Sequence, residues 1–194
     1  MRKQISDLWT RVMLRHTAFT GSYGKLRALY ARRDPWNMAS LREQHRFQAT
    51  NDLLSGFQPH YQTILELGCG EGHQSVSLAR LTDRFHGMDI SEFAIKRARK
   101  LVPQAEFRVG PLEAIDRIFP DVDFDLITAC EVLYYLPDPG VILPALQARS
   151  RRIFVSSYSE RTEGLRAAVE GPGWQSLPDI RFQHTVWNCF LWRR

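Results

Sequence analysis

The residues best suited to hold a ligand lie in the turn Glu66-Leu67-Gly68-Cys69-Gly70-Glu71-Gly72. Its three glycines, at alternate positions, let the backbone turn sharply and let a ligand come closer than a Cβ would allow. The turn follows the apolar run 63–67 and precedes a helical pattern that starts near His73. Free N–H groups at the start of that helix would point toward the ligand. The sequence therefore predicts a ligand-binding strand–turn–helix unit.

The spacing of these glycines separates two classes of ligand. A turn that binds a pyrophosphate has the pattern G-x-G-x-x-G, whereas here the pattern is G-x-G-x-G and His73 stands where the third glycine should be. Glu66 and Glu71 add negative charges, which would repel a pyrophosphate and suit a ligand with a sulfonium and an ammonium group. We therefore expect S-adenosylmethionine rather than NAD.

Asp89 strengthens this interpretation. It lies seventeen residues past Gly72, at the end of the apolar run 84–89. An acidic residue at that point accepts hydrogen bonds from two adjacent ribose hydroxyls. A glycine pattern alone is a weak signal, but it becomes specific when a strand precedes it, a helix follows it and an aspartate stands at this distance.

The elements that must position these residues alternate along the chain after residue 61. Strand patterns at 63–67, 84–89, 106–109, 124–130 and 152–158 are separated by helical ones, which include 73–81 and 92–101 with Ser91 as N-cap. This alternation predicts an α/β fold with a doubly wound, Rossmann-like, mostly parallel sheet. The tail from Ile180 to Trp192 reads as strands with no helix between them, so we expect an antiparallel hairpin at one edge.

Residues 1–60 have a helical pattern, and we expect them to form a cap or lid on a cofactor-binding core at 61–194, within one domain, 1–194. A first helix has apolar residues on one face, and a second over 23–32 ends ahead of Pro35. A third follows Ser40, a good N-cap. The residues that define the first and third helices are Ile5, Leu8, Trp9, Val12 and Met13, and Leu41, His45, Phe47 and Leu53.

Five segments carry a resemblance to a known family. Ile64 to Gly72, Gly87-Met88-Asp89-Ile90-Ser91 and Phe124-Asp125-Leu126-Ile127 resemble successive motifs of class I S-adenosylmethionine-dependent methyltransferases. Glu131-Val132-Leu133-Tyr134-Tyr135-Leu136 and Asp34-Pro35-Trp36-Asn37 resemble one branch, the nodulation N-methyltransferases of the NodS type. The resemblance covers about residues 25–158.

The resemblance implies a set of cofactor-binding residues. Gly68 and Gly70 would line the methionine part, Asp89 would hold the ribose, Leu112 would lie against the adenine, and the backbone around Ala129 and Cys130 would receive the amino group. Contacts are also expected from Glu66, Cys69, His73, Ile90 and Trp36. A histidine at a helix start is more often a capping or surface residue, however, and Trp36 could equally be plain packing between helices.

One departure from the family concerns the adenine. The family usually has an acidic residue just after Gly110, where it bonds the adenine amino group. Here Pro111 stands at that position, so the bond is lost or is supplied by another group, with Glu113 as the candidate.

Methyl transfer is an in-line displacement with a good leaving group, so the protein contributes mainly alignment and desolvation. An amine acceptor must be neutral when it attacks, and a nearby acid–base group would assist it. Glu131 is the candidate because it leaves the fourth strand beside the expected methyl group; the alternative is a surface carboxylate that caps the next helix. Tyr134 and Tyr135 could form an aromatic wall for a positive charge, with only one of them facing the site.

Composition limits the other functions. The chain has 194 residues, a net charge of +5 and a pI near 9.4, without a long Lys/Arg run. Cys69, Cys130 and Cys189 form no Cys-x-x-Cys pair, so they are read as buried thiols, and neither they nor the histidines have metal-ligand spacing. No apolar run approaches a membrane span and no secretory signal is evident. We expect a cytoplasmic monomer or homodimer.

The predicted function is methylation of a small molecule, with an amine, such as that of an amino sugar, as the acceptor. The alternatives are an O-methyltransferase of a small metabolite, a nucleic-acid base methyltransferase, a nicotinamide oxidoreductase and a protein that only binds the cofactor. Base methyltransferases carry Asn/Asp-Pro-Pro-aromatic where this chain has Cys130-Glu131-Val132-Leu133, or a Pro-Cys dipeptide that is absent here. Nucleic acid is thus an unlikely partner.

Overall fold

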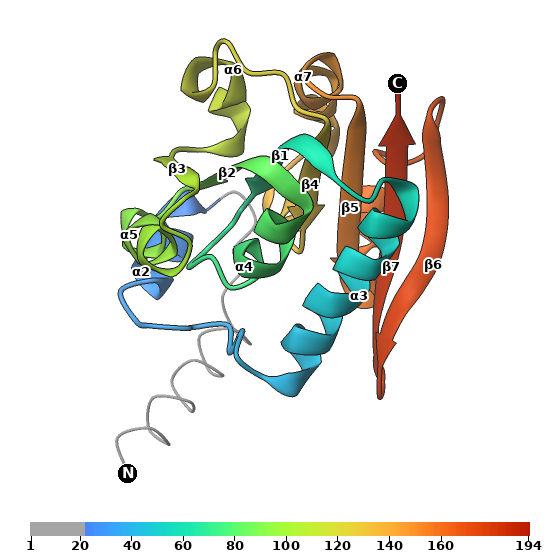
Figure 1. The fold of residues 1–194 in the computed structure, drawn as a ribbon. Coiled ribbons are helices and arrows are strands. Elements are labelled where there is room, and N and C mark those ends of the chain that lie inside the picture. Colours follow the sequence, from blue (N-terminus) through green and yellow to red (C-terminus); the bar gives the residue numbers. More distant parts are fainter. Residues whose placement is uncertain (1–21) are drawn as a thin grey trace.

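The computed structural model describes residues 22–194, and the first predicted helix lies outside them. Within this range seven strands form one sheet in the order β3-β2-β1-β4-β5-β7-β6 (Figure 1). Strands β1 to β5 run parallel, and β7 is antiparallel to both β5 and β6. The predicted doubly wound sheet with an antiparallel C-terminal edge is therefore confirmed. The strands are β1 Tyr61–Leu67, β2 Thr82–Asp89, β3 Glu106–Val109, β4 Leu126–Cys130, β5 Arg152–Tyr158, β6 Trp174–Phe182 and β7 Thr185–Arg193.

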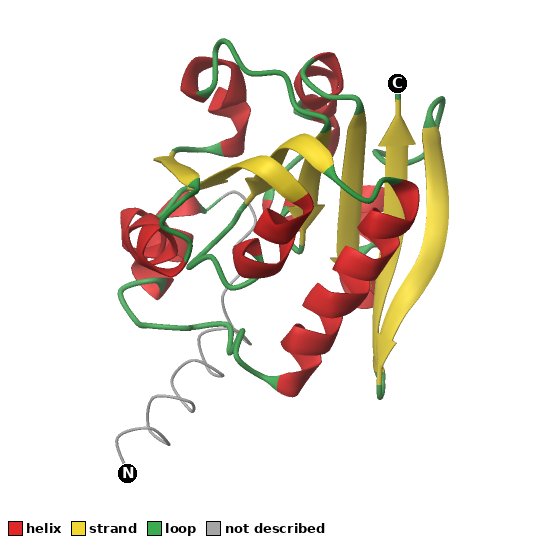
Figure 2. Cartoon of the chain, in the orientation of Figure 1, coloured by secondary structure: helices red, strands yellow, loops and turns green. Residues whose placement is uncertain are grey.

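Helices connect these strands and cover the sheet on both sides (Figure 2). Ser40 and Ser91 cap α3 and α5 as predicted, each accepting a hydrogen bond from the backbone N–H three residues on. The α-helices are α2 Tyr23–Leu29, α3 Leu41–Phe57, α4 Ser75–Leu78, α5 Glu92–Leu101, α6 Ile115–Ile118, α7 Leu143–Ala148 and α8 Glu163–Arg166. The 3-10 turns are η1 Ala79–Leu81, η2 Leu112–Ala114, η3 Leu133–Tyr135, η4 Pro139–Val141 and η5 Ser159–Arg161.

The core has two layers because side chains alternate between the faces of each strand. In β1, Ile64 packs with apolar residues of α3, α4 and α5, whereas its neighbour Leu65 packs with those of α6, α7 and α8. In β4, Leu126 and Ile127 divide in the same way. Both faces of the central strands are thus buried, which explains their nearly continuous apolar sequences.

The observed elements differ from the predicted ones mainly at their ends. The fourth strand begins at Leu126, since Phe124 forms only an isolated bridge to Ser150. The edge hairpin begins at Trp174 rather than Ile180, because β6 is an edge strand and its register shift between Leu177 and Ile180 accommodates Pro178. The second helix ends at Leu29 instead of residue 32, and the predicted helix 73–81 is a short helix followed by a 3-10 turn.

No helix among residues 22–194 is both long enough and apolar enough to cross a membrane.

Candidate functional site

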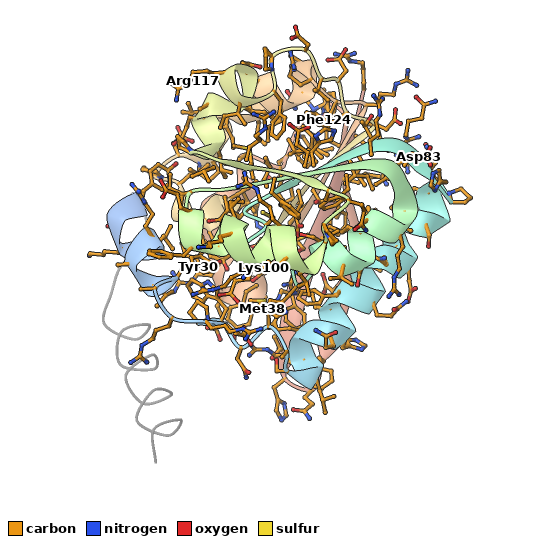
Figure 3. The ribbon with its side chains drawn as sticks, turned by 60° about the vertical axis from the view of Figure 1, so that its left-hand side comes forward. Tyr30, Met38, Asp83, Lys100, Arg117 and Phe124 are labelled. Carbon is orange, nitrogen blue, oxygen red and sulfur yellow. The ribbon has the colours of Figure 1, made fainter. Side chains whose placement is uncertain are left out.

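A cavity of about 240 Å³ lies at the carboxyl ends of β1, β2 and β4 and is closed by the segment that runs from α2 into α3. In Figure 3, Tyr30 and Met38 of that segment lie at the opposite end of the sheet from Asp83, the second residue of β2. This is the end at which parallel sheets bind ligands. The predicted cofactor residues on its wall are Trp36, Glu66, Gly68, Cys69, Gly70, His73, Asp89, Ile90, Leu112 and Cys130. Ala129 is not on the wall; it is fully buried inside β4, between β1 and β5.

Two glycines in the first turn make room for this cavity. Gly68 and Gly70 have φ values of +65° and +53°, in the left-handed region that favours glycine. A Cβ on Gly68 would collide with the side chain of Val132, and one on Gly70 would lie 2.7 Å from the Tyr30 hydroxyl. Glycine is therefore required at both positions by the backbone and by the neighbouring side chains.

Asp89 is fixed beside this turn at the end of β2. One carboxylate oxygen accepts the Gly70 N–H at 3.0 Å and the other accepts the Ser91 N–H at 2.8 Å. Burial raises the pKa of Asp89 to about 6, although these two bonds favour the ionised form. Each oxygen keeps lone pairs for further donors, so the position can accept hydroxyl groups of a ligand.

The two glutamates of the turn differ in their environments, and one of them does not offer a free charge. Glu71 accepts the Asp34 N–H at 3.0 Å and pairs with Arg97 at 2.5 Å. Although burial opposes it, bonds from His73, Asp34 and Arg97 lower the pKa of Glu71. Glu71 is therefore an ionised carboxylate on the cavity wall, and its charge is paired with that of Arg97.

Glu66 lies deeper in the wall of the cavity, 3% exposed, and accepts a short hydrogen bond from the Ser75 hydroxyl. Burial raises its pKa to about 8. A carboxyl group in this state is largely protonated at neutral pH and can be ionised when a cation arrives beside it.

At the adenine end of the predicted pocket, Pro111 and Leu112 line the cavity but Glu113 does not. The Glu113 carboxylate instead accepts the Tyr23 hydroxyl at 2.6 Å. Glu113 is therefore not the substitute for the missing acidic residue; it ties η2 to the helix α2.

Glu131, the predicted acid–base residue, lies directly after β4 on the cavity wall. Its backbone has φ +58°, unusual for a residue with a side chain, and its N–H donates to the Ser156 carbonyl at 3.0 Å. One carboxylate oxygen accepts the Tyr134 hydroxyl at 3.3 Å, while the other, Oε1, is buried with no hydrogen-bond partner among the described residues. Burial raises the pKa of Glu131 to about 7, against the influence of Arg46.

Tyr134 and Tyr135 both line the cavity. Their ring centroids are 4.6 Å apart, and Tyr135 lies 6.0 Å from the ring of Trp36. The expectation that only one tyrosine would face the site is wrong, because the chain forms the 3-10 turn η3 here rather than an α-helix. Three aromatic rings thus form one corner of the cavity.

The structure contains a buried ion pair on α3 that was not predicted from the sequence. Arg46, 2% exposed, donates to Glu43 at 2.9 Å and to the Gln74 side chain at 2.9 Å, and all three line the cavity. The spacing i, i+3 on a helix was a usable signal, but it resembles that of ordinary surface pairs. Of the residues that define this helix in the sequence, Phe47 is buried, whereas Leu41 is 81% exposed.

The segment before α3 is held against the glycine turn by polar contacts. Arg97 of α5 donates to the carbonyls of Tyr30 and Arg32 at 2.9 Å as well as to Glu71. The Trp36 indole N–H donates to the Tyr30 hydroxyl at 3.2 Å, so Trp36 both packs and lines the cavity. His73 lies on the wall, 3.6 Å from Glu71.

The three cysteines are free thiols, and all are buried. Burial raises the pKa of Cys130 to about 11 and that of Cys189 to about 12, and it raises that of Cys69 as well. Among residues 22–194 no cluster of three or more His, Cys, Asp and Glu side chains could hold a metal ion.

Comparison with known proteins identifies the family. Residues 60–170, more than half of the chain, match the family model described as a methyltransferase domain. A trans-aconitate 2-methyltransferase of Azoarcus sp. is 34% identical over 136 residues, which cover 66% of this chain and 53% of the relative. A ubiquinone biosynthesis O-methyltransferase of Bordetella parapertussis is 28% identical over 131 residues, 64% of this chain and 52% of the relative. The chain thus spans about half the length of these relatives.

Solved structures share the fold. The N-methyltransferase NodS of Bradyrhizobium japonicum, in complex with S-adenosylhomocysteine, has a TM-score of 0.72 at 18% identity and covers 92% of this chain and 100% of its own. Magnesium protoporphyrin IX methyltransferase of Synechocystis, with bound S-adenosylmethionine, has a TM-score of 0.66 at 16% identity and covers 97% of each chain. The prediction of the methyltransferase family is confirmed by the match over residues 60–170. With its sheet, its glycine turn and its match over residues 60–170, this chain belongs to the methyltransferase-domain family.

Proposed function

We propose that this chain binds S-adenosylmethionine and transfers its methyl group to an amine on a small molecule, such as an amino sugar. The observation that carries the proposal is Glu131, a buried carboxyl group on the cavity wall directly after β4, with a backbone φ of +58° and a pKa that burial raises to about 7. A carboxylate held in this way, in a strained backbone conformation, is a typical feature of a working site.

The residues present fit the cofactor. The cradle at Gly68 and Gly70 has no room for a Cβ, and Asp89 keeps lone pairs for ribose hydroxyls. Leu112 and Ile90 supply apolar surface for the adenine, and Cys130 lies on the wall at the end of β4. When bound, S-adenosylmethionine supplies an activated methyl group on a sulfonium. We further propose that residues 1–60 act as a cap over this core, with Trp36 above the cofactor.

Glu131 would hold the acceptor amine by its free oxygen and take up a proton from it. A pKa of about 7 is suited to this role, because both protonation states are then populated near neutral pH. The Tyr134 hydroxyl, which donates to the other oxygen, keeps the carboxylate oriented. The rings of Tyr134 and Tyr135 can stabilise the positive charge of an ammonium.

The NodS-like branch is part of the same proposal. It is supported by the motif at 131–136, which forms the acceptor side of the cavity, and by the likeness in fold to NodS. An O-methyltransferase is the second candidate, supported by the names of the two relatives. In that case Glu131 would take its proton from a hydroxyl group.

Binding is tested first, by the shift in melting temperature with S-adenosylhomocysteine and with NAD. We expect S-adenosylhomocysteine to stabilise the protein and NAD to leave it unchanged; the reverse would overturn the assignment. Asp89→Ala should weaken S-adenosylhomocysteine binding at least tenfold in calorimetry, about 1.4 kcal/mol, because two hydrogen bonds to the ribose would be lost. Unchanged affinity would remove Asp89 from the ribose role.

Transfer is tested with methyl-labelled S-adenosylmethionine and a panel of small amines, amino sugars, phenols and carboxylic acids. The products are first separated by chromatography from the labelled S-adenosylmethionine, which is itself a cation. A methylated amine is then retained on a cation exchanger, whereas a methyl ester releases methanol in base. Label retained in amines supports N-methylation. Label only in ethers or esters would favour the O-methyltransferase, and binding without any transfer would favour a cofactor-binding protein.

A further inference from the structure

The helix α5 presents a charged face to solvent, close to the cofactor cavity. Phe93, Lys96, Arg97, Lys100 and Leu101 follow the spacing i, i+3, i+4, i+7, i+8, which places them on one side of the helix. Phe93 is 56% exposed and Leu101 is 46% exposed, and both lysines are exposed. The opposite side of α5 packs into the core through Ala94, Ile95 and Ala98.

The positive charge on this face continues onto the neighbouring segment. Arg33, Arg97 and Lys100 line a shallow hollow of about 430 Å³ with His73, Glu71 and Leu101. Arg27 of α2 lies 3.9 Å from Glu92 at the start of α5, so the two elements are side by side. The excess positive charge here comes from Arg33, Lys96 and Lys100, because Arg97 is paired with Glu71 and Arg27 faces Glu92.

Two large exposed apolar side chains with lysines between them give this face the two kinds of group that bind a membrane surface. The nine residues from Phe93 to Leu101 span about 12 Å of helix. Aromatic and aliphatic side chains of such a helix enter the headgroup region, while lysines and arginines contact anionic lipids. We propose that this face of α5, with Arg27 and Arg33, docks the protein on an anionic lipid surface.

The positive charge of this face favours an anionic lipid surface as its binding partner over residues 1–21 of the same chain. Residues 1–21 carry Arg2, Lys3, Arg11 and Arg15 against the single acid Asp7, so they would be repelled by the α5 face. Nucleic acid would satisfy the cations but not the exposed Phe93 and Leu101. Because the hollow shares Glu71 and His73 with the wall of the cavity, docking also brings the site beside the membrane.

The test is co-sedimentation of the full chain with vesicles of phosphatidylcholine alone and of phosphatidylcholine mixed with phosphatidylglycerol. We expect binding to the mixed vesicles only, weakened by added salt. Each cation near such a surface contributes about fivefold in affinity, so Lys96→Glu with Lys100→Glu should lose more than about tenfold. Phe93→Ser with Leu101→Ser should weaken binding with little change in its salt dependence.

The matched control is Arg80→Glu with Arg84→Glu. Both arginines are exposed and lie beside Asp83, which Figure 3 places far from Lys100, and the change in net charge is the same. The control should bind the mixed vesicles like the unaltered protein. Equal losses of vesicle binding in the two double variants would show an effect of net charge alone and would overturn the proposal. Failure of the unaltered protein to bind the mixed vesicles, or binding to duplex DNA alone, would overturn it as well.

Discussion

Replacing Arg46 by methionine should be among the most destabilising single changes in α3. The side chain is 2% exposed and donates to Glu43 and Gln74. Its loss leaves Glu43, itself 4% exposed, without its buried counter-charge. Breaking a buried ion pair from one side costs about 3–5 kcal/mol. In a chain of this length 1 kcal/mol shifts the melting temperature by about 2–4 °C, so we expect a fall of roughly 6–20 °C.

The reasoning is tested by a double-mutant cycle of Arg46→Met, Glu43→Gln and the double variant, each unfolded by urea and by heat. Because the double variant removes both charges, its loss should be clearly smaller than the sum of the single losses, with a coupling of about 1 kcal/mol or more. Arg42→Gln is the control: Arg42 also bonds Glu43, but its side chain is 49% exposed, so the loss should stay below about 1 kcal/mol. Additive single losses would refute the account of a coupled buried pair.

Three further predictions concern the site. Because burial raises the pKa of Glu66 to about 8, well above that of an unfolded glutamate, the protonated form stabilises the fold and this stability is lost as the pH rises from about 4.5 to 8. Urea titrations over this pH range should therefore show a smaller fall in the free energy of unfolding for Glu66→Gln than for the unaltered protein. If the two proteins have parallel curves of unfolding free energy against pH, the raised pKa of Glu66 is contradicted. Gly68→Ala should reduce both stability and S-adenosylhomocysteine affinity, because alanine is strained at a φ of +65° and its Cβ would collide with Val132. Adding Val132→Ala should restore only part of either loss, because the backbone strain remains. Melting temperatures and calorimetry measure the two effects. Glu131→Gln should slow methyl transfer by about 10²–10⁴ with cofactor affinity nearly unchanged; full activity would reduce Glu131 to a structural role.

The sheet and the cofactor turn could be predicted because their signals are local. Strand periodicity, the glycines at 68 and 70 and the position of Asp89 each lie within one βα unit, and the parallel topology then brings them to one edge. The predicted hairpin begins later than the observed one because the residues before Ile180 include Pro178 and polar side chains. An edge strand tolerates such residues, whereas a central strand does not.

The part of the cavity wall formed by α3 could not be predicted in the same way. Glu43 and Arg46 have the spacing of a solvated helix pair, and only the position of α3 over the end of β4 buries them. Likewise, nothing near Glu71 in the sequence indicates that Arg97, one helix away, compensates its charge. Charges whose partners come from distant segments are decided by tertiary structure, which periodicity does not report.

The burial of the three thiols makes their alkylation rates a measure of local opening of the structure. The thiolate is the reactive form, and a buried thiol with a raised pKa reacts only when the structure around it opens. Cys69 and Cys130 lie on the cavity wall and Cys189 lies in β7, in the antiparallel part of the sheet. The chain therefore contains natural reporters in two regions, and the rates at which they are alkylated distinguish breathing of the ligand cavity from fraying of the sheet.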